Sequence, residues 1–120
     1  MDRIWVCCRF LVWRTALLMR IELFYFDGCP NVKATLERLN RILETSGLNC
    51  CVMQTHVGDY EMAQSVGFLG SPTVRINDVD IEPSARSRTD FGIMCRTYDG
   101  KGVPSEDLIR RAIEKAENAC

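Results

Sequence analysis

One cysteine stands at the junction between a strand-like and a helix-like segment, and this junction restricts both the fold and the chemistry of the chain. Residues 21–26 (IELFYF) are almost wholly apolar and rich in residues that favour β-strands. Residues 32–46 carry apolar side chains at helical spacing. Cys29 lies between the two segments, in the sequence DGCPN. The pattern predicts a strand that passes through a short turn into a helix, with Cys29 in the turn.

A cysteine at a helix start meets unpaired N–H groups and the positive end of the helix dipole, and both favour its thiolate. We expect Cys29 to be the helix cap or its neighbour, with Pro30 near the first helical position. Lys33 adds positive charge one turn further on, whereas the carboxylate of Asp27 opposes a thiolate. Because the thiolate is the reactive form, Cys29 is a candidate nucleophile or soft-metal ligand. The alternative is a buried, inert cysteine.

Size and charge exclude several classes of protein. The 120 residues suggest one domain, which can bury a core without disulfides. The net charge of −1 gives no electrostatic argument for nucleic acid. No apolar run is long enough to cross a membrane. We therefore predict no nucleic-acid partner and no membrane partner.

The chain has seven cysteines, an odd number, whereas a secreted disulfide scaffold normally has an even number and an export signal. Arg9 and Arg14 interrupt the apolar N-terminal stretch, which also lacks a small-residue cleavage site. We therefore predict a cytoplasmic protein whose thiols are mostly reduced. Residues 1–18 are expected to be an appended or loosely ordered segment before a domain at 19–120. The alternative is that Trp5, Leu11 and Trp13 cover part of the core.

The remaining segments give the order β-α-β-α-β-β-α, which predicts an α/β fold. Residues 49–57 read as a second strand, and a short helix is expected between Asp59 as its cap and Gly67 as its end. Residues 73–76 and 79–81 read as two antiparallel strands around a tight turn, and Ser105 is expected to cap the last helix. Residues 82–102 form a long polar loop.

This order, with Cys-Pro at the first helix and Ser-Pro-Thr before the third strand, resembles the thioredoxin/glutaredoxin superfamily over about residues 20–118. The segments LFYFDGCPN, GFLGSPTVRIND and MCRTY resemble, more narrowly, a group of small bacterial thioredoxin-like proteins. Some members of that group carry selenocysteine at the position of Cys29, and some are labelled alkylmercury (organomercurial) lyase-like. The resemblance implies a thioredoxin-like fold, with a four-stranded mixed sheet and helices on both faces.

The resemblance also implies a thiol–disulfide redox function in which Cys29 is the nucleophile. Thioredoxins carry a second cysteine three positions on, where this chain has Val32. Release of the product then needs glutathione as a co-substrate or a cysteine from elsewhere. Cys95 is the candidate, because the loop after the fourth strand should emerge on the side of Cys29 and could fold over it as a lid. The alternative is a cover strand whose cysteine is merely buried.

The proline that matches Pro72 is cis in that superfamily. A cis bond would leave the backbone of Ser71 exposed to pair with an extended substrate. With Gly28, Pro30 and Thr73, these residues form the predicted substrate-binding set. The partners implied are protein or small-molecule thiols and disulfides, and the protein is expected to be a monomer or weak dimer.

Two other functions stay open. Cys29 and Cys95 could hold Hg(II) or Cu(I) between two thiolates, with Asp27 assisting protonolysis of a carbon–mercury bond. Alternatively, the fold could be a binding module without catalysis. No Cys/His cluster has zinc spacing, and we expect His56, the one histidine, to be surface or core rather than catalytic. Arg86, Arg88 and Arg96 could form a basic lip for glutathione carboxylates, or a solvated loop.

Overall fold

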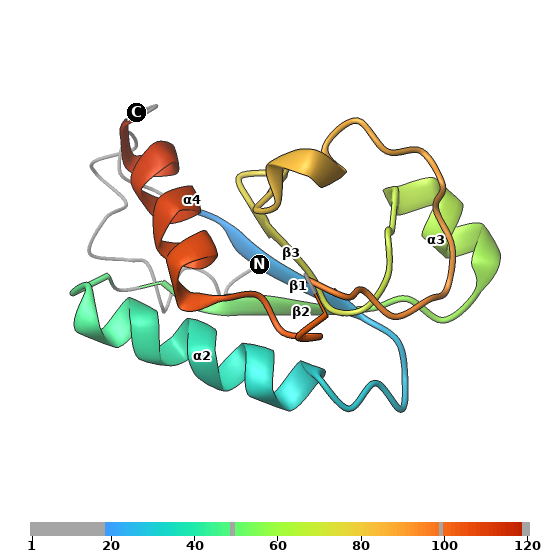
Figure 1. Cartoon of the computed structure of the whole chain (residues 1–120), viewed down its shortest axis with the longest axis horizontal. Coiled ribbons are helices and arrows are strands. Elements are labelled where there is room, and N and C mark those ends of the chain that lie inside the picture. The colour runs from blue at the N-terminus through green and yellow to red at the C-terminus, as the bar shows by residue number, and fades with distance from the viewer. Residues whose placement is uncertain (1–18, 49, 99, 119–120) are drawn as a thin grey trace.

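The structure, a computed structural model, describes residues 19–48, 50–98 and 100–118, which form a four-stranded mixed sheet with three α-helices (Figure 1). The sequence correctly predicts the order of these elements. It misses a short 3-10 helix in the long loop and starts the second strand too early. The elements are β1 (Ile21–Tyr25), α2 (Val32–Thr45), β2 (Val52–His56), α3 (Tyr60–Val66), β3 (Thr73–Ile76), β4 (Val79–Asp80), η3 (Pro83–Ala85) and α4 (Glu106–Asn118).

The strands lie in the order β2-β1-β3-β4. β1 runs parallel to β2, with Tyr25 beside His56, and antiparallel to β3, with Phe24 beside Thr73. β4 pairs antiparallel with β3. The ends of β1 and β2 and the start of β3 therefore meet at one end of the sheet. The loop that contains Cys29 leaves β1 at this end.

The two faces of the sheet are covered by different helices. Leu23 packs in a cluster with side chains of α2 and α4, whereas Phe24 packs in a second cluster with Ala63 of α3 and with Phe68. Consecutive residues of a strand point to opposite faces. Hence α2 and α4 cover one face and α3 the other. The amphipathic patterns of α2 and α4 bury Leu39, Ile42, Ile109 and Ile113 against β1 and β3.

Local signals fix the ends of the short helix as predicted. The Asp59 carboxylate accepts a hydrogen bond from the Met62 N–H at 2.8 Å, and Gly67 ends α3 in the left-handed conformation at φ +71°. Among the described residues, no helix has the length and apolar character that crossing a membrane requires. The predictions for residues 1–18 lie outside the described residues, as do Cys7, Cys8 and Cys120.

Candidate functional site

Cys29 lies in an open turn between β1 and α2. Its thiol is free and half-buried, and Asp27, Gly28 and Pro30 around it are exposed. Gly28 has φ +84°, a conformation that a side chain disfavours, and this lets the chain reverse direction directly after the strand. A sulfur in such a turn can be reached by a molecule from solvent. Cys29 is therefore not the fully buried residue of the alternative, and its reactivity stays a prediction.

The helix begins slightly later than the sequence suggests. Asn31, not Cys29, is the N-cap of α2, so Cys29 lies two residues before the cap. The Asn31 carbonyl accepts both the N–H of Thr35 at 3.1 Å and its hydroxyl at 2.7 Å. The Asn31 side chain makes no capping bond. The expectation that Cys29 is the cap or its neighbour is thus wrong, although the thiol remains close to the start of the helix.

Asp27 has a partner that the sequence analysis did not propose. Its carboxylate Oδ2 lies 3.2 Å from His56 Nε2, at the end of β2. The parallel register that places Tyr25 beside His56 brings the histidine within reach of the turn two residues later. The imidazole also lies against the Tyr25 ring, with centroids 5.5 Å apart. The sequence did not reveal this contact, because it depends on the register between β1 and β2, which tertiary pairing sets.

The Ser71–Pro72 bond is cis, as expected, and it directly precedes β3. The residues around it are sealed from solvent: Ser71, Pro72 and Thr73 are all buried. The Thr73 hydroxyl donates to the Gly70 carbonyl. The Ser71 hydroxyl is buried without a hydrogen-bond partner among the described residues. These side chains support the bend and do not offer contacts at the surface.

The backbone of Ser71 is already paired, which corrects the prediction that it is exposed for a substrate. Its N–H donates to the Met94 carbonyl at 2.8 Å, and its carbonyl accepts the Arg96 N–H at 3.0 Å. These bonds make a parallel bridge between Ser71 and Cys95. Residues 91–98, which we call the strap, therefore fold onto the serine–proline bend (Figure 1, orange). The strap uses the backbone edge that a peptide would need. Its expected role as a lid over Cys29 stays a prediction.

A buried charge network fastens the strap to the sheet. The Arg96 guanidinium, only 2% exposed, bonds to Asp80 at 2.7 Å and also to Glu82 and to the Thr73 hydroxyl. Burial acts to lower the pKa of Arg96, but the bonds to Asp80 and Glu82 act the other way and hold it above its ordinary value. The arginine thus stays charged and is paired throughout, as a buried charge must be.

Tyr98 fixes the end of the strap to the proline itself. Its hydroxyl donates to the Pro72 carbonyl at 2.6 Å, and its ring lies 4.6 Å below the guanidinium carbon of Arg96. Burial is the main cause that raises the pKa of Tyr98 above its ordinary value, against the opposing effect of Arg96. The phenol is therefore a neutral donor at physiological pH.

Two glycines allow the chain to approach this closely. A Cβ on Gly70, at φ +117°, would lie 2.8 Å from Arg96 Cγ and 2.9 Å from the Met94 carbonyl oxygen. A Cβ on Gly102 would lie 2.6 Å from Nδ2 of Asn31. The chain that follows the strap therefore passes the start of α2, two residues from Cys29.

Cys95 is exposed and is a free thiol, and no disulfide joins it to Cys29. It lines a cavity of about 330 Å³, together with residues of the strap and of the segment from Glu82 to Arg88. Among the described residues, none from the turn at 26–31 lines this cavity. The strap thus brings the backbone of Cys95 to Ser71, and a role for its sulfur as the partner of Cys29 stays a prediction.

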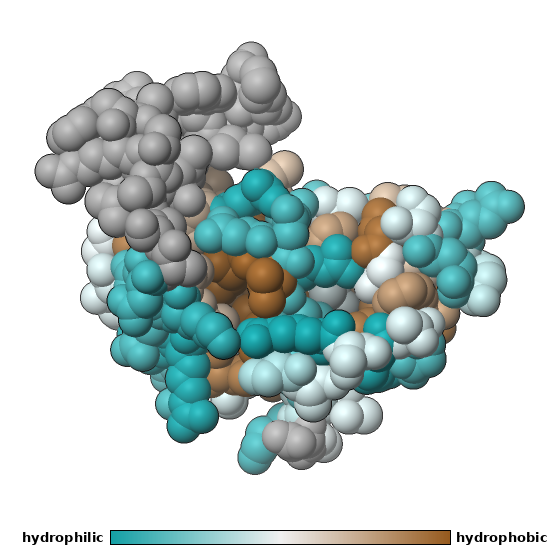
Figure 2. Space-filling view, turned by 90° about the horizontal axis from the view of Figure 1, so that it is seen from above, coloured by the Kyte–Doolittle hydropathy of each residue, from teal (hydrophilic) through white to brown (hydrophobic). Residues whose placement is uncertain are grey.

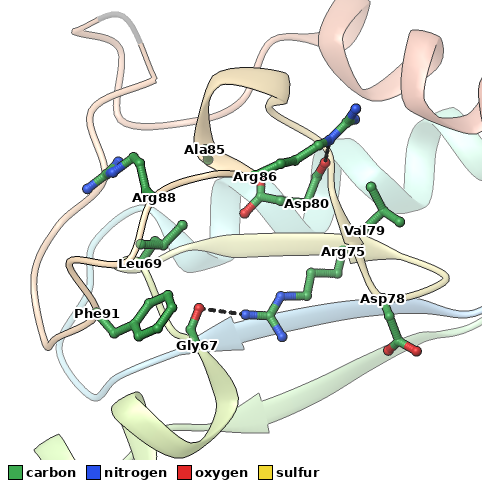
Figure 3. Close-up of a pocket in the computed structure, with 10 residues that line it drawn as sticks. All are labelled: Gly67, Leu69, Arg75, Asp78, Val79, Asp80, Ala85, Arg86, Arg88 and Phe91. Atoms are coloured by element: carbon green, nitrogen blue, oxygen red, sulfur yellow. Dashed lines mark hydrogen bonds between the residues drawn. The ribbon is translucent and has the colours of Figure 1, made fainter.

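A second cavity, of about 360 Å³, lies on β3 and β4 and is lined by Arg86 and Arg88, two of the three arginines that were considered as a basic lip (Figure 3). Arg75 points across it toward the Gly67 carbonyl, at 2.7 Å, while Arg86 and Arg88 extend away in different directions. Arg86 bonds to the Asp80 carbonyl and Arg88 to the Asp90 carboxylate. Arg96 is buried and so cannot belong to a basic lip, whereas Arg86 and Arg88 are exposed. The face shown in Figure 2 carries hydrophobic and hydrophilic patches side by side.

The part of the chain that the structure describes holds no group of three or more His, Cys, Asp or Glu side chains that could bind a metal ion. A site between the two thiolates of Cys29 and Cys95 stays a prediction. Cys51 is disulfide-bonded, an exception to the expectation that the thiols are mostly reduced. The Cys50 thiol donates to the Met19 carbonyl at 3.5 Å.

Comparison of this chain with protein-family models, with curated proteins and with solved structures gave no match. The site is therefore interpreted from its own geometry.

Proposed function

We propose that the protein is a thioredoxin-like thiol–disulfide exchange protein that uses Cys29 as its single nucleophile. The observation that carries this proposal is a free, half-buried thiol in an open turn, at the end of the sheet where the cis Ser71–Pro72 bond also lies. The order of the elements and the helices on both faces of the sheet support a thioredoxin-like fold.

Cys29 would act without a neighbouring resolving cysteine. Val32 occupies the position three residues on and begins α2. Cys95 lies in the strap, where its thiol lines a cavity outside the turn. A low-molecular-weight thiol such as glutathione would then release the product by attacking the mixed disulfide on Cys29.

The test is thiol exchange followed by location of the modified cysteine. The reduced full-length chain is mixed with a small chromogenic disulfide, and peptide mass mapping identifies which sulfur carries the adduct. We expect the first adduct on Cys29 and loss of glutathione-dependent turnover in Cys29→Ser. Cys95→Ser is the matched control. It keeps turnover if glutathione resolves the adduct, and it accumulates the Cys29 adduct if Cys95 is the resolving thiol.

A Cys29→Ser variant with wild-type turnover would contradict the proposal. The fold could then serve as a binding module, and the same variant would keep its biological activity. Titration of both variants with Hg(II) separates the soft-metal alternative, since that site needs both sulfurs.

A further inference from the structure

The strap occupies the backbone edge at which an extended polypeptide would pair with Ser71. A peptide that adds to such an edge needs an unpaired N–H and an unpaired carbonyl. Both groups of Ser71 are bonded within the chain, to Met94 and to Arg96, at 2.8 and 3.0 Å. The segment around Cys95 therefore already occupies the position that the backbone of a bound peptide would take.

Contacts on both sides of this bridge hold the strap closed. Before it, the Gly92 N–H donates to the Phe68 carbonyl at 3.0 Å. After it, Tyr98 donates to the Pro72 carbonyl at 2.6 Å. Between them, Arg96 is buried with Asp80. A peptide could pair with Ser71 only if the strap left, and this would break the hydrogen bonds of a buried charge.

Cys29, by contrast, keeps part of its surface exposed while the strap is closed. Gly28 and Pro30 on its two sides are exposed. A small disulfide needs only to approach the Cys29 sulfur with its S–S bond in line with that sulfur. It needs no hydrogen bond to the backbone of Ser71. Small and extended substrates therefore differ in what the closed strap allows.

We propose that Cys29 exchanges with the disulfides of small thiols and discriminates against disulfides within extended polypeptides, because the strap replaces the peptide at Ser71. The inference rests on the proposed thiol exchange at Cys29 and adds the class of substrate. In the first step, the Cys29 thiolate forms a bond to one sulfur of the disulfide as the other sulfur leaves as a thiolate, which takes a proton from water. A second small thiolate then attacks the adduct sulfur, which forms a new small disulfide and returns Cys29 as a thiolate.

The experiment compares two substrates that both release 2-mercaptoethanol when Cys29 bonds to the other sulfur of the disulfide, so that the peptide reaction is counted by its peptide adduct. One is bis(2-hydroxyethyl) disulfide, and the other is a short unstructured peptide whose one cysteine carries 2-mercaptoethanol as a mixed disulfide. The rate of adduct formation on Cys29 is followed by mass spectrometry. An extended peptide can dock at Ser71 only after the strap gives up its two backbone hydrogen bonds there, and this cost corresponds to about a tenfold loss or more. The small disulfide does not meet this cost, so we expect it to react at least about tenfold faster.

A strap variant tests the cause of this preference. Tyr98→Phe removes the bond to Pro72, so we expect the ratio of the two rate constants to fall toward one. Tyr60→Phe is the matched control, because Tyr60 is exposed on α3 and lies outside the strap. Hydrogen exchange of the Ser71 and Arg96 amides gives a measure of closure that is independent of activity, and both amides should be protected in the wild-type chain.

Equal rate constants for the two substrates would overturn this inference and leave thiol exchange at Cys29 standing. Ser71 and Arg96 amides that exchange as fast as an open loop would also overturn it, whatever the activity. The absence of any Cys29-dependent reaction with either substrate would overturn the proposed function, and this inference with it.

Discussion

His56 Nε2 lies 3.2 Å from Asp27 Oδ2, so the end of β2 is linked to the turn that contains Cys29. The carboxylate of Asp27 is 89% exposed, whereas the carboxylate of Asp80, which binds Arg96, is only 8% exposed. One contact lies in water in the turn that contains Cys29, and the other lies under the strap. An aspartate contact therefore contributes much more to the stability of the fold at position 80 than at position 27.

Asp80→Asn should destabilise the protein far more than Asp27→Asn. The first variant leaves Arg96 buried with one carboxylate fewer, which costs about 3 kcal/mol. The second breaks an exposed contact worth less than about 1 kcal/mol. Urea unfolding of both variants at pH 7 measures the difference. Similar losses of stability in the two variants would contradict the buried network.

Gly70→Ala should prevent the strap from closing. At φ +117° the new methyl group would lie 2.8 Å from Arg96 Cγ, and we expect a cost of about 3 kcal/mol from backbone strain and overpacking together. Gly47→Ala is the control, since Gly47 also has a positive φ but its Cβ would meet nothing within 4 Å. It should cost about 1 kcal/mol. Denaturant unfolding measures both, and equal costs would argue against close contact at Gly70.

Tyr98 should make the protein less stable at alkaline pH. Because the folded-state pKa of Tyr98 is raised above the ordinary value of 10.0, the folded protein keeps a proton that the unfolded chain has lost. The resulting stability is fully present below pH 10 and falls as the pH rises above it, by at most about 1.4 kcal/mol per pH unit.

Tyr98→Phe removes the pH-dependent contribution of Tyr98 to stability. The difference in unfolding free energy between wild type and variant should therefore shrink as the pH rises from about 9 to about 11. At neutral pH the variant should be less stable by about 1–3 kcal/mol, because the buried Pro72 carbonyl loses its donor. A difference that stays constant over this pH range would show that the phenol is not buried as described.

The two helix starts should respond differently to removal of their caps. Asp59→Ala should cost about 1 kcal/mol, because the Asp59 carboxylate bonds to the Met62 N–H. Asn31→Ala should cost only a few tenths of a kcal/mol through capping, since the Asn31 side chain makes no capping bond. Thermal unfolding of the two variants provides the comparison. A larger loss for Asn31→Ala would indicate a capping bond in solution.

Local sequence patterns predicted the helices, strands and turns because interactions between residues close in the sequence determine them. The period of apolar residues gave α2 and α4, and the Asp59 cap and Gly67 gave both ends of α3. The Cys29 turn was found in the same way, since an apolar strand, a glycine and a proline follow one another in the chain. The exact helix start was missed. It is set by the backbone hydrogen bond from the Thr35 N–H to the Asn31 carbonyl, which the sequence pattern does not reveal.

The sequence by itself therefore determined the α/β order and the position of the candidate nucleophile. Tertiary structure alone decided that Ser71 is closed by the strap and that Asp27 meets His56. It also decided that Arg96, which reads as a solvated loop arginine, is a buried anchor. These contacts join residues 16 to 29 positions apart, and no periodic pattern records them. They follow from strand register and from the need of buried backbone groups and charges to find partners.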